Sequence, residues 1–108
     1  MKSRLHRSTR HPAPSPEISA FTFESDRDFP RHRHGQYGVG VILSGGHRSW
    51  SGVGAVEAVA GDVITVNPEE THDGAPLGGA PRRWRMVYFD PAYLSLRLGE
   101  AALGDLEF

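Results

Sequence analysis

Three histidines in two separate segments are the side chains of this sequence best suited to chemistry. His32 and His34 lie two residues apart in RHRHG, and His72 lies in GDVITVNPEETHDG. Successive side chains of a β-strand point to opposite faces, so His32 and His34 are predicted to project from one face. Histidine is the commonest metal ligand because its neutral ring nitrogen is available near pH 7. The spacing therefore predicts imidazoles that hold a metal, hold an organic ligand, or form hydrogen bonds inside a polar-lined pocket.

Other kinds of catalytic site find little support in the sequence. It contains no cysteine, which excludes disulfides and thiolate metal sites and fits a reducing compartment. There is no serine–histidine–aspartate arrangement, and the glycines of GVGVILSGG do not open a helix as a nucleotide-binding loop requires. Glu69, Glu70 and Asp73 beside His72 could form an acid–base pair, but their place in a loop favours a solvated surface cluster.

The composition is that of one small globular domain. The chain has 108 residues, of which 38% are hydrophobic. No apolar run reaches the roughly 18 to 20 residues that a membrane helix needs, and the N-terminus lacks the apolar region of a signal peptide. We therefore expect a cytoplasmic protein without a membrane partner.

Residues 1–17 form a basic, proline-containing N-terminal arm. Residues 1–16 carry four Lys or Arg side chains and no acid, whereas the rest of the chain has eight basic and thirteen acidic residues. The alternate prolines Pro12, Pro14 and Pro16 predict an extended connection. We interpret the arm as a disordered, solubilising tail, with contact to nucleic acid or to an acidic patch of the chain's own body as the alternative.

Residues 18–90 have the pattern of an all-β domain. Aromatic and β-branched residues between Gly, Pro and Asn turn signals predict six short strands. The predicted strands are 18–24, 37–45, 47–53, 55–60, 63–67 and 84–90. Gly45-Gly46 predicts a hairpin turn between the second and third of them. Short strands with turns about every ten residues indicate a barrel or a sandwich.

Residues 91–108 are predicted to start a C-terminal helical segment. Asp90 is a suitable N-cap, and Pro91 suits the first helical position. The sequence then stops without a polar closing segment. We therefore expect a short helix that belongs to an element cut short.

The two histidine segments together resemble the paired motifs of the cupin superfamily, which are small β-barrels that bind a ligand in their interior. A metal-binding cupin typically has a glutamate four or five residues after the second histidine, where this sequence has Gly38 and Val39. In the second motif Asn67 replaces a proline and Glu69 replaces a glycine. Three histidines and water suffice for Zn²⁺, whereas oxygen-using iron sites normally include a carboxylate. We expect no cofactor, with a divalent metal on His32, His34 and His72 as the alternative.

A more specific resemblance extends over about residues 18–98. In order, GVILSGGHRSWSG, GDVITVNPEETHDG and RRWRMVYFDPAYL resemble the N-terminal effector-binding and dimerisation domain of AraC-type transcription regulators. The resemblance implies a cupin-like jelly-roll barrel that binds a small-molecule effector, often a sugar, with an N-terminal arm folded over the pocket. It also implies a homodimer formed through helices after the barrel, and DNA binding by a separate helix-turn-helix domain. Nothing in this sequence resembles that domain, so we expect a sensor truncated before the dimerisation helices, with DNA as a partner only through the missing part.

The last predicted strand supplies further candidates for the pocket. Alternation puts Trp84, Met86 and Tyr88 on one face of the strand, and the resemblance directs this face toward the effector. Trp84 offers a flat apolar surface for stacking on a sugar ring, although core packing alone would also explain it. Gly74 stands where the arabinose-responsive member has a pocket aromatic, which argues against that sugar. The predicted ligand-binding residues are His32, His34, His72, Trp84, Met86 and Tyr88.

Two functions remain open from the sequence. The first is the effector-sensing domain of an AraC-type regulator, which is not an enzyme. The alternative is a stand-alone small cupin metalloenzyme with a three-histidine site. Val87 and Phe89 on the opposite strand face need a cover, and burial of two such side chains contributes roughly 3 to 6 kcal/mol. We therefore expect a chain that is weakly stable or associates through this face.

Overall fold

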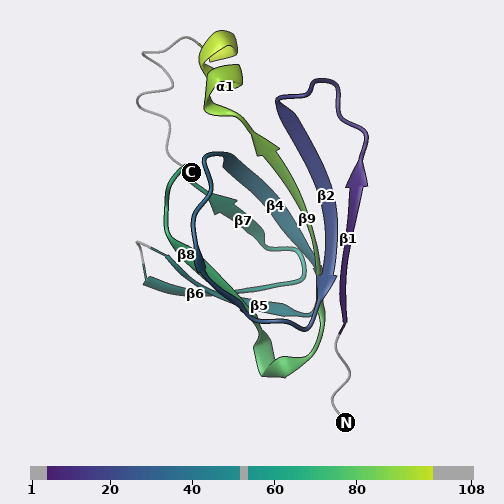
Figure 1. Cartoon of the computed structure of the whole chain (residues 1–108). Helices are drawn as coiled ribbons and strands as arrows, with labels where there is room; N and C mark the ends of the chain where they lie inside the picture. Colours follow the sequence, from purple (N-terminus) through teal and green to yellow (C-terminus); the bar gives the residue numbers. More distant parts are fainter. Residues whose placement is uncertain (1–4, 52–53, 99–108) are drawn as a thin grey trace.

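A computed structural model describes residues 5–51 and 54–98 of the chain. These residues form short strands, one 3-10 turn and one helix (Figure 1). The elements are β1 (His6–His11), β2 (Ile18–Ser25), β3 (Phe29–His32), β4 (Tyr37–Ser44), β5 (Gly46–Ser51), β6 (Gly54–Val59), β7 (Val63–Val66), β8 (His72–Pro76), η1 (Leu77–Gly79), β9 (Arg82–Phe89) and α1 (Pro91–Leu98). The predicted all-β class with a short C-terminal helix is confirmed.

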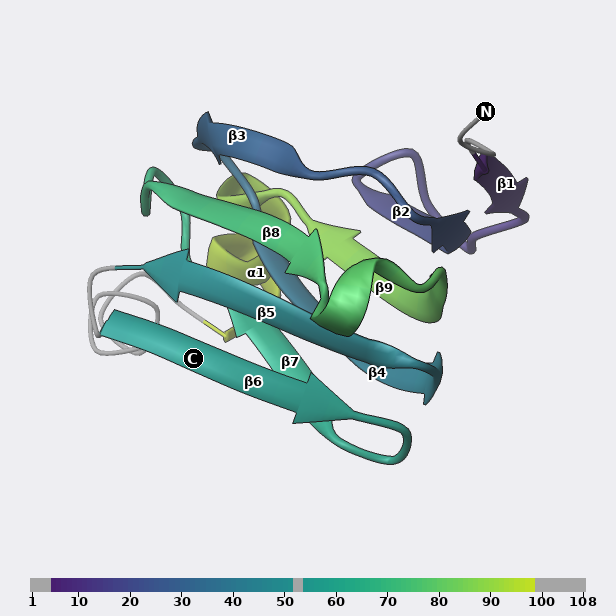
Figure 2. The same ribbon diagram turned by 90° about the horizontal axis from the view of Figure 1, so that it is seen from below.

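Two antiparallel sheets face each other and enclose the interior. One sheet has the order β1-β2-β9-β4-β7, and the other has the order β3-β8-β5-β6. Figure 2 shows β3, β8, β5 and β6 side by side in front of the five-stranded sheet. Because the chain repeatedly crosses between the sheets, side chains from distant segments meet in the space between them.

Alternation along β9 determines which residues face the interior. Trp84 and Met86 are 7% and 3% exposed, whereas Arg83 and Arg85 between and beside them are exposed. Trp84 lies opposite Phe23 of β2 and Ile42 of β4, so the three side chains share the inner face. The resulting core is small and is centred on Ile42, Ala58, Trp84 and Met86.

The interpretation of the arm as a disordered tail is wrong for the part that the structure describes. Residues 6–11 form β1, which pairs with β2 along its whole length, from His6 opposite Ser25 to His11 opposite Ala20. The His6 and His11 rings also form hydrogen bonds with Ser25 Oγ and Thr22 Oγ1. Backbone ladder hydrogen bonds need no apolar side chains, so a strand can form where the sequence has little hydrophobic pattern.

The predicted hairpin at Gly45-Gly46 is also wrong, because β4 and β5 lie in different sheets. Gly45 adopts a φ of 74°, and a Cβ there would lie 2.6 Å from the Pro81 carbonyl oxygen. The two glycines therefore make a corner through which the chain passes from one sheet to the other. Strands β3 and β8, which were not among the six predicted strands, complete the second sheet.

Helix α1 begins at Pro91, as predicted. The Leu94 amide donates to the Asp90 carbonyl at 3.2 Å, which closes the first helical turn. The predicted continuation over 99–108 lies outside the described residues. In the described part of the chain no helix is long and apolar enough to cross a bilayer.

Val87 and Phe89 are half-buried on the outer face of the sheet. Val87 lies between Ala20 and Val39 on the neighbouring strands, and Phe89 lies at the end of β9. Association through this face stays a prediction.

Candidate functional site

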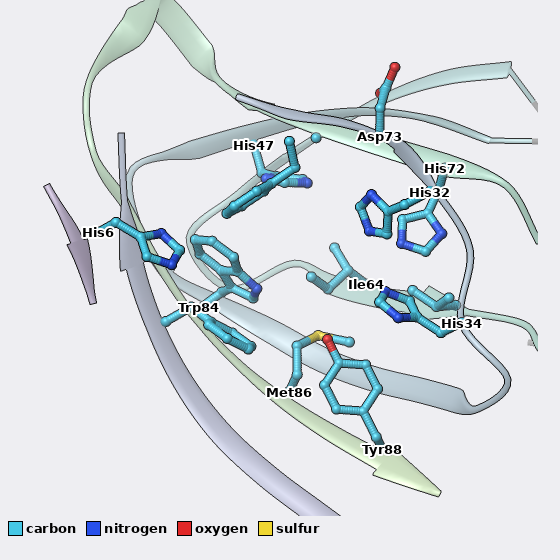
Figure 3. A pocket seen from close by; sticks show the side chains of 14 residues that line it. His6, His32, His34, His47, Ile64, His72, Asp73, Trp84, Met86 and Tyr88 are labelled. Atoms are coloured by element: carbon cyan, nitrogen blue, oxygen red, sulfur yellow. The ribbon is translucent and has the colours of Figure 1, made fainter. Parts of the chain in front are cut away.

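A cavity of about 330 Å³ lies between the two sheets (Figure 3). Such a volume is at the small end of the range of about 300 to 1,000 Å³ for ligand pockets. The six residues predicted from the sequence to bind a ligand all line it: His32, His34, His72, Trp84, Met86 and Tyr88. Eight more residues complete the lining: His6, Phe23, Phe29, His47, Ile64, Val66, Asp73 and Gly74.

Three of the lining histidines converge on one point. His32 at the end of β3 and His72 at the start of β8 are cross-strand partners, with ring centroids 4.3 Å apart. His34 lies 4.9 Å from His32 and 5.1 Å from His72 by the same measure. One nitrogen from each ring lies within 4.8 Å of the others. We call these three residues the histidine triad.

Strand alternation is not what brings His34 to the triad. Strand β3 ends at His32, so His34 lies in the connection that follows. This connection is fixed by the opposite loop, because the Glu69 amide donates to the His34 carbonyl. The predicted convergence is therefore correct, but the predicted reason is wrong.

The backbone sets the tautomers of two triad rings. His32 Nδ1 lies 2.6 Å from the Pro30 carbonyl oxygen, and His72 Nδ1 lies 3.0 Å from the Glu70 carbonyl oxygen. A carbonyl oxygen can only accept, so both Nδ1 atoms carry hydrogen and both neutral rings keep a lone pair on Nε2. Burial, followed by the neighbouring His32 and His72 rings, lowers the pKa of His34 and favours its neutral form as well.

These donors fit a divalent metal of the zinc type. Metal-bound histidines commonly donate their second ring nitrogen to a backbone carbonyl, as His32 and His72 do. Position 38 carries glycine and therefore no carboxylate, and a larger side chain there would require its neighbours to shift, because a Cβ at Gly38 would lie 3.0 Å from Met86 Cε and 3.1 Å from Tyr88 Cε1. The triad therefore offers three imidazoles and leaves the remaining positions to water or to a ligand.

His47 is a lining residue that the sequence analysis missed. Arg82 Nε donates to His47 Nδ1 at 3.0 Å, so the neutral ring must carry its hydrogen on Nε2. Burial and then the Arg82 charge lower the pKa of His47 to about 4, which keeps the ring neutral at physiological pH. Alternation along β5 would have revealed it, because His47 and the exposed Arg48 must point to opposite faces.

Arg82 is the most deeply buried charged residue of the described chain, with 1% of its surface exposed. Its Nη1 donates to the carbonyls of Ser25 and Arg27 at 2.9 and 2.7 Å, and its guanidinium lies 4.8 Å from the Trp84 ring. Burial lowers its pKa to about 10, against the opposing effect of Asp28 and Asp26. Arg82 therefore stays charged at neutral pH and holds His47 in one tautomer.

Apolar side chains form the wall between these polar groups. Phe23 and Phe29 pack around Trp84, with ring centroids 5.2 and 6.3 Å from it. Trp84 thus packs in the core and also lines the cavity, and its binding of a ligand stays a prediction. Tyr88 lies 6.0 Å from His34 by ring centroids, and burial raises the pKa of its hydroxyl.

The acidic candidates from the sequence, and Trp50, lie at the margin of the cavity or outside it. Trp50 does not line it and packs under the Arg31 guanidinium, 4.0 Å from the ring centroid, as a surface aromatic. Asp73 lines the cavity but points its carboxylate away from it (Figure 3), where it accepts from the Trp50 amide and pairs with Arg31. Glu69 forms an exposed ion pair with Arg33, so the surface interpretation of the acidic cluster fits the structure.

Comparison with known proteins places this geometry in a family context. A family model described as AraC-like ligand binding domain matches residues 16–102. No curated protein matches the chain.

Solved structures agree on the fold. The cupin domain of Cnp3 from Schizosaccharomyces pombe has a TM-score of 0.74 at 13% identity, and the match covers 91% of this chain and 75% of that one. A Cupin 2 conserved barrel domain protein from Salinispora arenicola has a TM-score of 0.67 at 19% identity, covering 84% of this chain and 81% of that one. A cupin superfamily protein from Desulfitobacterium hafniense has a TM-score of 0.67 at 14% identity, covering 83% and 84%. The predicted cupin-like fold is confirmed.

Proposed function

This chain belongs to the family of AraC-like ligand-binding domains, and we propose that it senses a small-molecule effector bound in the cavity between its sheets. The observation that carries the proposal is the cavity itself, in which three convergent imidazoles face an aromatic and aliphatic wall. Mostly apolar hollows with a few convergent polar groups are the usual form of small-molecule sites. The chain then acts by binding, and we do not assign it an enzymatic role.

Both sheets and the N-terminal arm take part in the proposed site. Trp84 and Phe23 come from the five-stranded sheet, and His47 and His72 come from the four-stranded sheet. His6 of the arm lines the same cavity. An effector in this position contacts elements that are distant in sequence. Its binding can therefore change the position of these elements relative to one another, as a sensor requires.

The family resemblance supports several finer proposals. A sugar could stack on the face of Trp84, as the resemblance implies. The intact regulator is proposed to form a homodimer, to bind DNA through a helix-turn-helix domain, and to act in the cytoplasm. The half-buried outer face with Val39 and Val87, and Val63 at 67% exposure beside it, offers apolar surface for such an association.

Tryptophan fluorescence tests the sensor proposal directly. The chain has two tryptophans, so Trp50→Phe leaves Trp84 in the cavity wall as the reporter. We expect a saturable change of Trp84 emission on titration with a member of a panel of sugars, small carboxylic acids and small amines. The same titration of Trp84→Phe, which retains Trp50, should give no change. A panel without any saturable response would contradict the proposal.

A metal-dependent cupin enzyme is the second candidate, because the triad donors suit a divalent cation. Such a cation, when bound by His32, His34 and His72, supplies Lewis-acid chemistry to a ligand in the cavity. Elemental analysis of the purified protein tests this candidate. Stoichiometric zinc, iron, nickel or manganese that is lost in His34→Gln and retained in His11→Gln would favour it. Metal content well below one equivalent in the unchanged protein would contradict the enzyme candidate, and the sensor would be the one remaining proposal.

A further inference from the structure

The cavity has two polar ends whose histidines are held in opposite hydrogen-bonding states. Figure 3 shows His47 and Trp84 at one end and the histidine triad at the other. At the triad end, His32 and His72 donate through Nδ1 to backbone carbonyls, so Nε2 is the nitrogen that each ring can use to accept. At the other end, His47 accepts from Arg82 through Nδ1 and presents its Nε2–H, which donates.

A buried positive charge stands behind the His47 donor. Arg82 is 1% exposed, and its Nη2 is buried without a hydrogen-bond partner in the described part of the chain. Asp28 and Asp26 are near enough to raise its pKa, but among the described residues no carboxylate forms an ion pair with it. Hydrogen bonds in a chain polarise one another, so an imidazole that accepts from a guanidinium is a stronger donor at its other nitrogen. This end therefore favours a ligand atom that accepts and carries negative charge.

The cavity walls between the two ends have few hydrogen-bonding groups for a polyhydroxylated ligand. Phe23, Phe29, Ile64, Val66 and Met86 line the space, and the lining residue Asp73 turns its carboxylate toward Arg31 and the Trp50 amide. Along these walls a sugar would find polar atoms only on the lining residues Tyr88, Trp84 and His6, which are fewer than its hydroxyl groups, and unpaired buried polar groups oppose binding. A compact hydrocarbon body meets no such cost.

The neighbouring strand is adapted to the His47 ring. A Cβ at Gly74 would lie 2.6 Å from His47 Cε1 and 2.9 Å from Nε2, so any larger residue would displace the ring. Glycine at position 74 thus leaves the His47 donor where the cavity can reach it. The same contact explains why position 74 carries no aromatic side chain in this sequence.

We propose that His47 is the specificity-determining donor of the cavity and that the effector is a small carboxylate with an apolar body, in place of the sugar that the family resemblance implies. A carboxylate oxygen accepts from His47 Nε2, the body lies along Trp84 and Met86, and any polar group at the far end is a hydroxyl or amine that donates to the triad. This assignment rests on the proposed function, since it names the ligand class of the same cavity.

The tautomers can be tested first, without a ligand. In ¹⁵N-labelled protein at neutral pH, long-range ¹H–¹⁵N correlations report which ring nitrogen carries hydrogen. We expect the Nε2–H form for His47 and the Nδ1–H form for His32 and His72. An Nδ1–H form of His47 would remove the donor and overturn the proposal.

The ligand class is tested by equilibrium dialysis of the unchanged protein with matched probes. The acids are phenylacetate, cyclohexylacetate and 4-methylpentanoate, and the amines are 2-phenylethylamine, 2-cyclohexylethylamine and 4-methylpentylamine, with L-arabinose and D-glucose as the sugars. We expect at least one acid to bind, at least tenfold more tightly than its matched amine and than either sugar. Amines or sugars that bind as tightly as the acids would overturn the assignment and leave the sensor function standing. No binding by any probe would count against both.

Variants then test the residue. His47→Leu is expected to weaken binding of the acid at least tenfold, and His11→Leu, on the outer side of the arm, is the matched control. His47→Gln keeps a group that can accept from Arg82 and donate to the ligand, so it is expected to recover part of the loss. Acid binding that is unchanged in a folded His47→Leu protein would overturn the role of His47, and the comparison of acids with amines stands even where this variant does not fold.

Discussion

The two polar ends of the cavity use one residue type in two different settings. The histidine triad lies at the ends of short strands and in the connection after β3, and its three side chains are half-buried. His47 and Arg82 lie within the sheets, and Arg82 is almost completely buried. The partner of Nδ1 is a carbonyl at the triad and a guanidinium at His47, so one end accepts and the other donates. From this comparison we expect the Arg82 end to support the fold as well as the ligand, whereas the triad end should contribute less to the stability of the fold.

Arg82→Ala tests this division with the largest expected effect. The substitution leaves the Ser25 and Arg27 carbonyls and His47 Nδ1 without their donor and opens a hole in the interior. We expect the free energy of unfolding in urea to fall by about 3 to 5 kcal/mol. Arg85→Ala, at an exposed position of the same strand, should change it by less than about 0.5 kcal/mol. Equal losses in the two variants would break the comparison.

Acid should weaken the fold through His47. The pKa of His47 is depressed to about 4 by burial and by Arg82, so between pH 6.5 and 4 the unfolded chain binds a proton that the folded chain does not. Stability from this group is therefore fully present above pH 6.5 and is lost as the pH falls toward 4. The expected loss is roughly 2 to 3 kcal/mol, measured by urea unfolding at a series of pH values.

The His47→Gln variant provides the control for this pH dependence. Other groups also titrate in this range, so the informative quantity is the difference between the unchanged protein and the variant. We expect the unchanged protein to have the steeper fall. Parallel curves would show that the His47 end contributes no such pH dependence.

Alternation along β9 could be predicted from the sequence because it is a local property of one long strand. Period two places Trp84, Met86 and Tyr88 on one face, and the family resemblance indicated that this face points inward. Strand partners are not local, so a glycine pair can indicate a change of direction without indicating the sheet that the chain enters next. The hairpin predicted at Gly45-Gly46 failed for this reason. Strand β1 was missed because its side chains are mostly exposed and its pairing depends on the backbone.

The same distinction explains which parts of the site could be predicted. The triad could be recognised because His32 and His34 are closely spaced and because the two histidine segments together resemble the paired cupin motifs. The role of His47 depends on Arg82, which is 35 residues away in sequence and meets it only across the two sheets. Alternation along β5 can place His47 on the inner face, but nothing in its spacing indicates that a guanidinium holds it as a donor.

The triad end should tolerate substitution that the Arg82 end does not. His34→Gln removes a half-buried ring whose interactions are mainly with its two neighbours. We expect unfolding in urea to change by no more than about 1 kcal/mol, because surface and half-buried substitutions without a buried partner cost little. Binding of a ligand or metal at the triad should be weakened in the same variant. A loss above about 3 kcal/mol would mean that the triad, too, supports the fold.

Backbone strain at Glu69, beside the triad, is expected to have the smallest effect on stability, and it can be tested by comparing two variants of one residue. Glu69 adopts a φ of 61°, a left-handed conformation that suits glycine, and its amide holds His34 in place. Its exposed ion pair with Arg33 contributes about 0 to 1 kcal/mol, and both Glu69→Gly and Glu69→Ala remove it. Only glycine also removes the Cβ that opposes the left-handed backbone, so Glu69→Gly should be more stable to urea than Glu69→Ala by about 1 kcal/mol. A Glu69→Ala protein at least as stable as the Glu69→Gly protein would show that the loop is not held in this conformation. Another contact would then have to hold His34 in place.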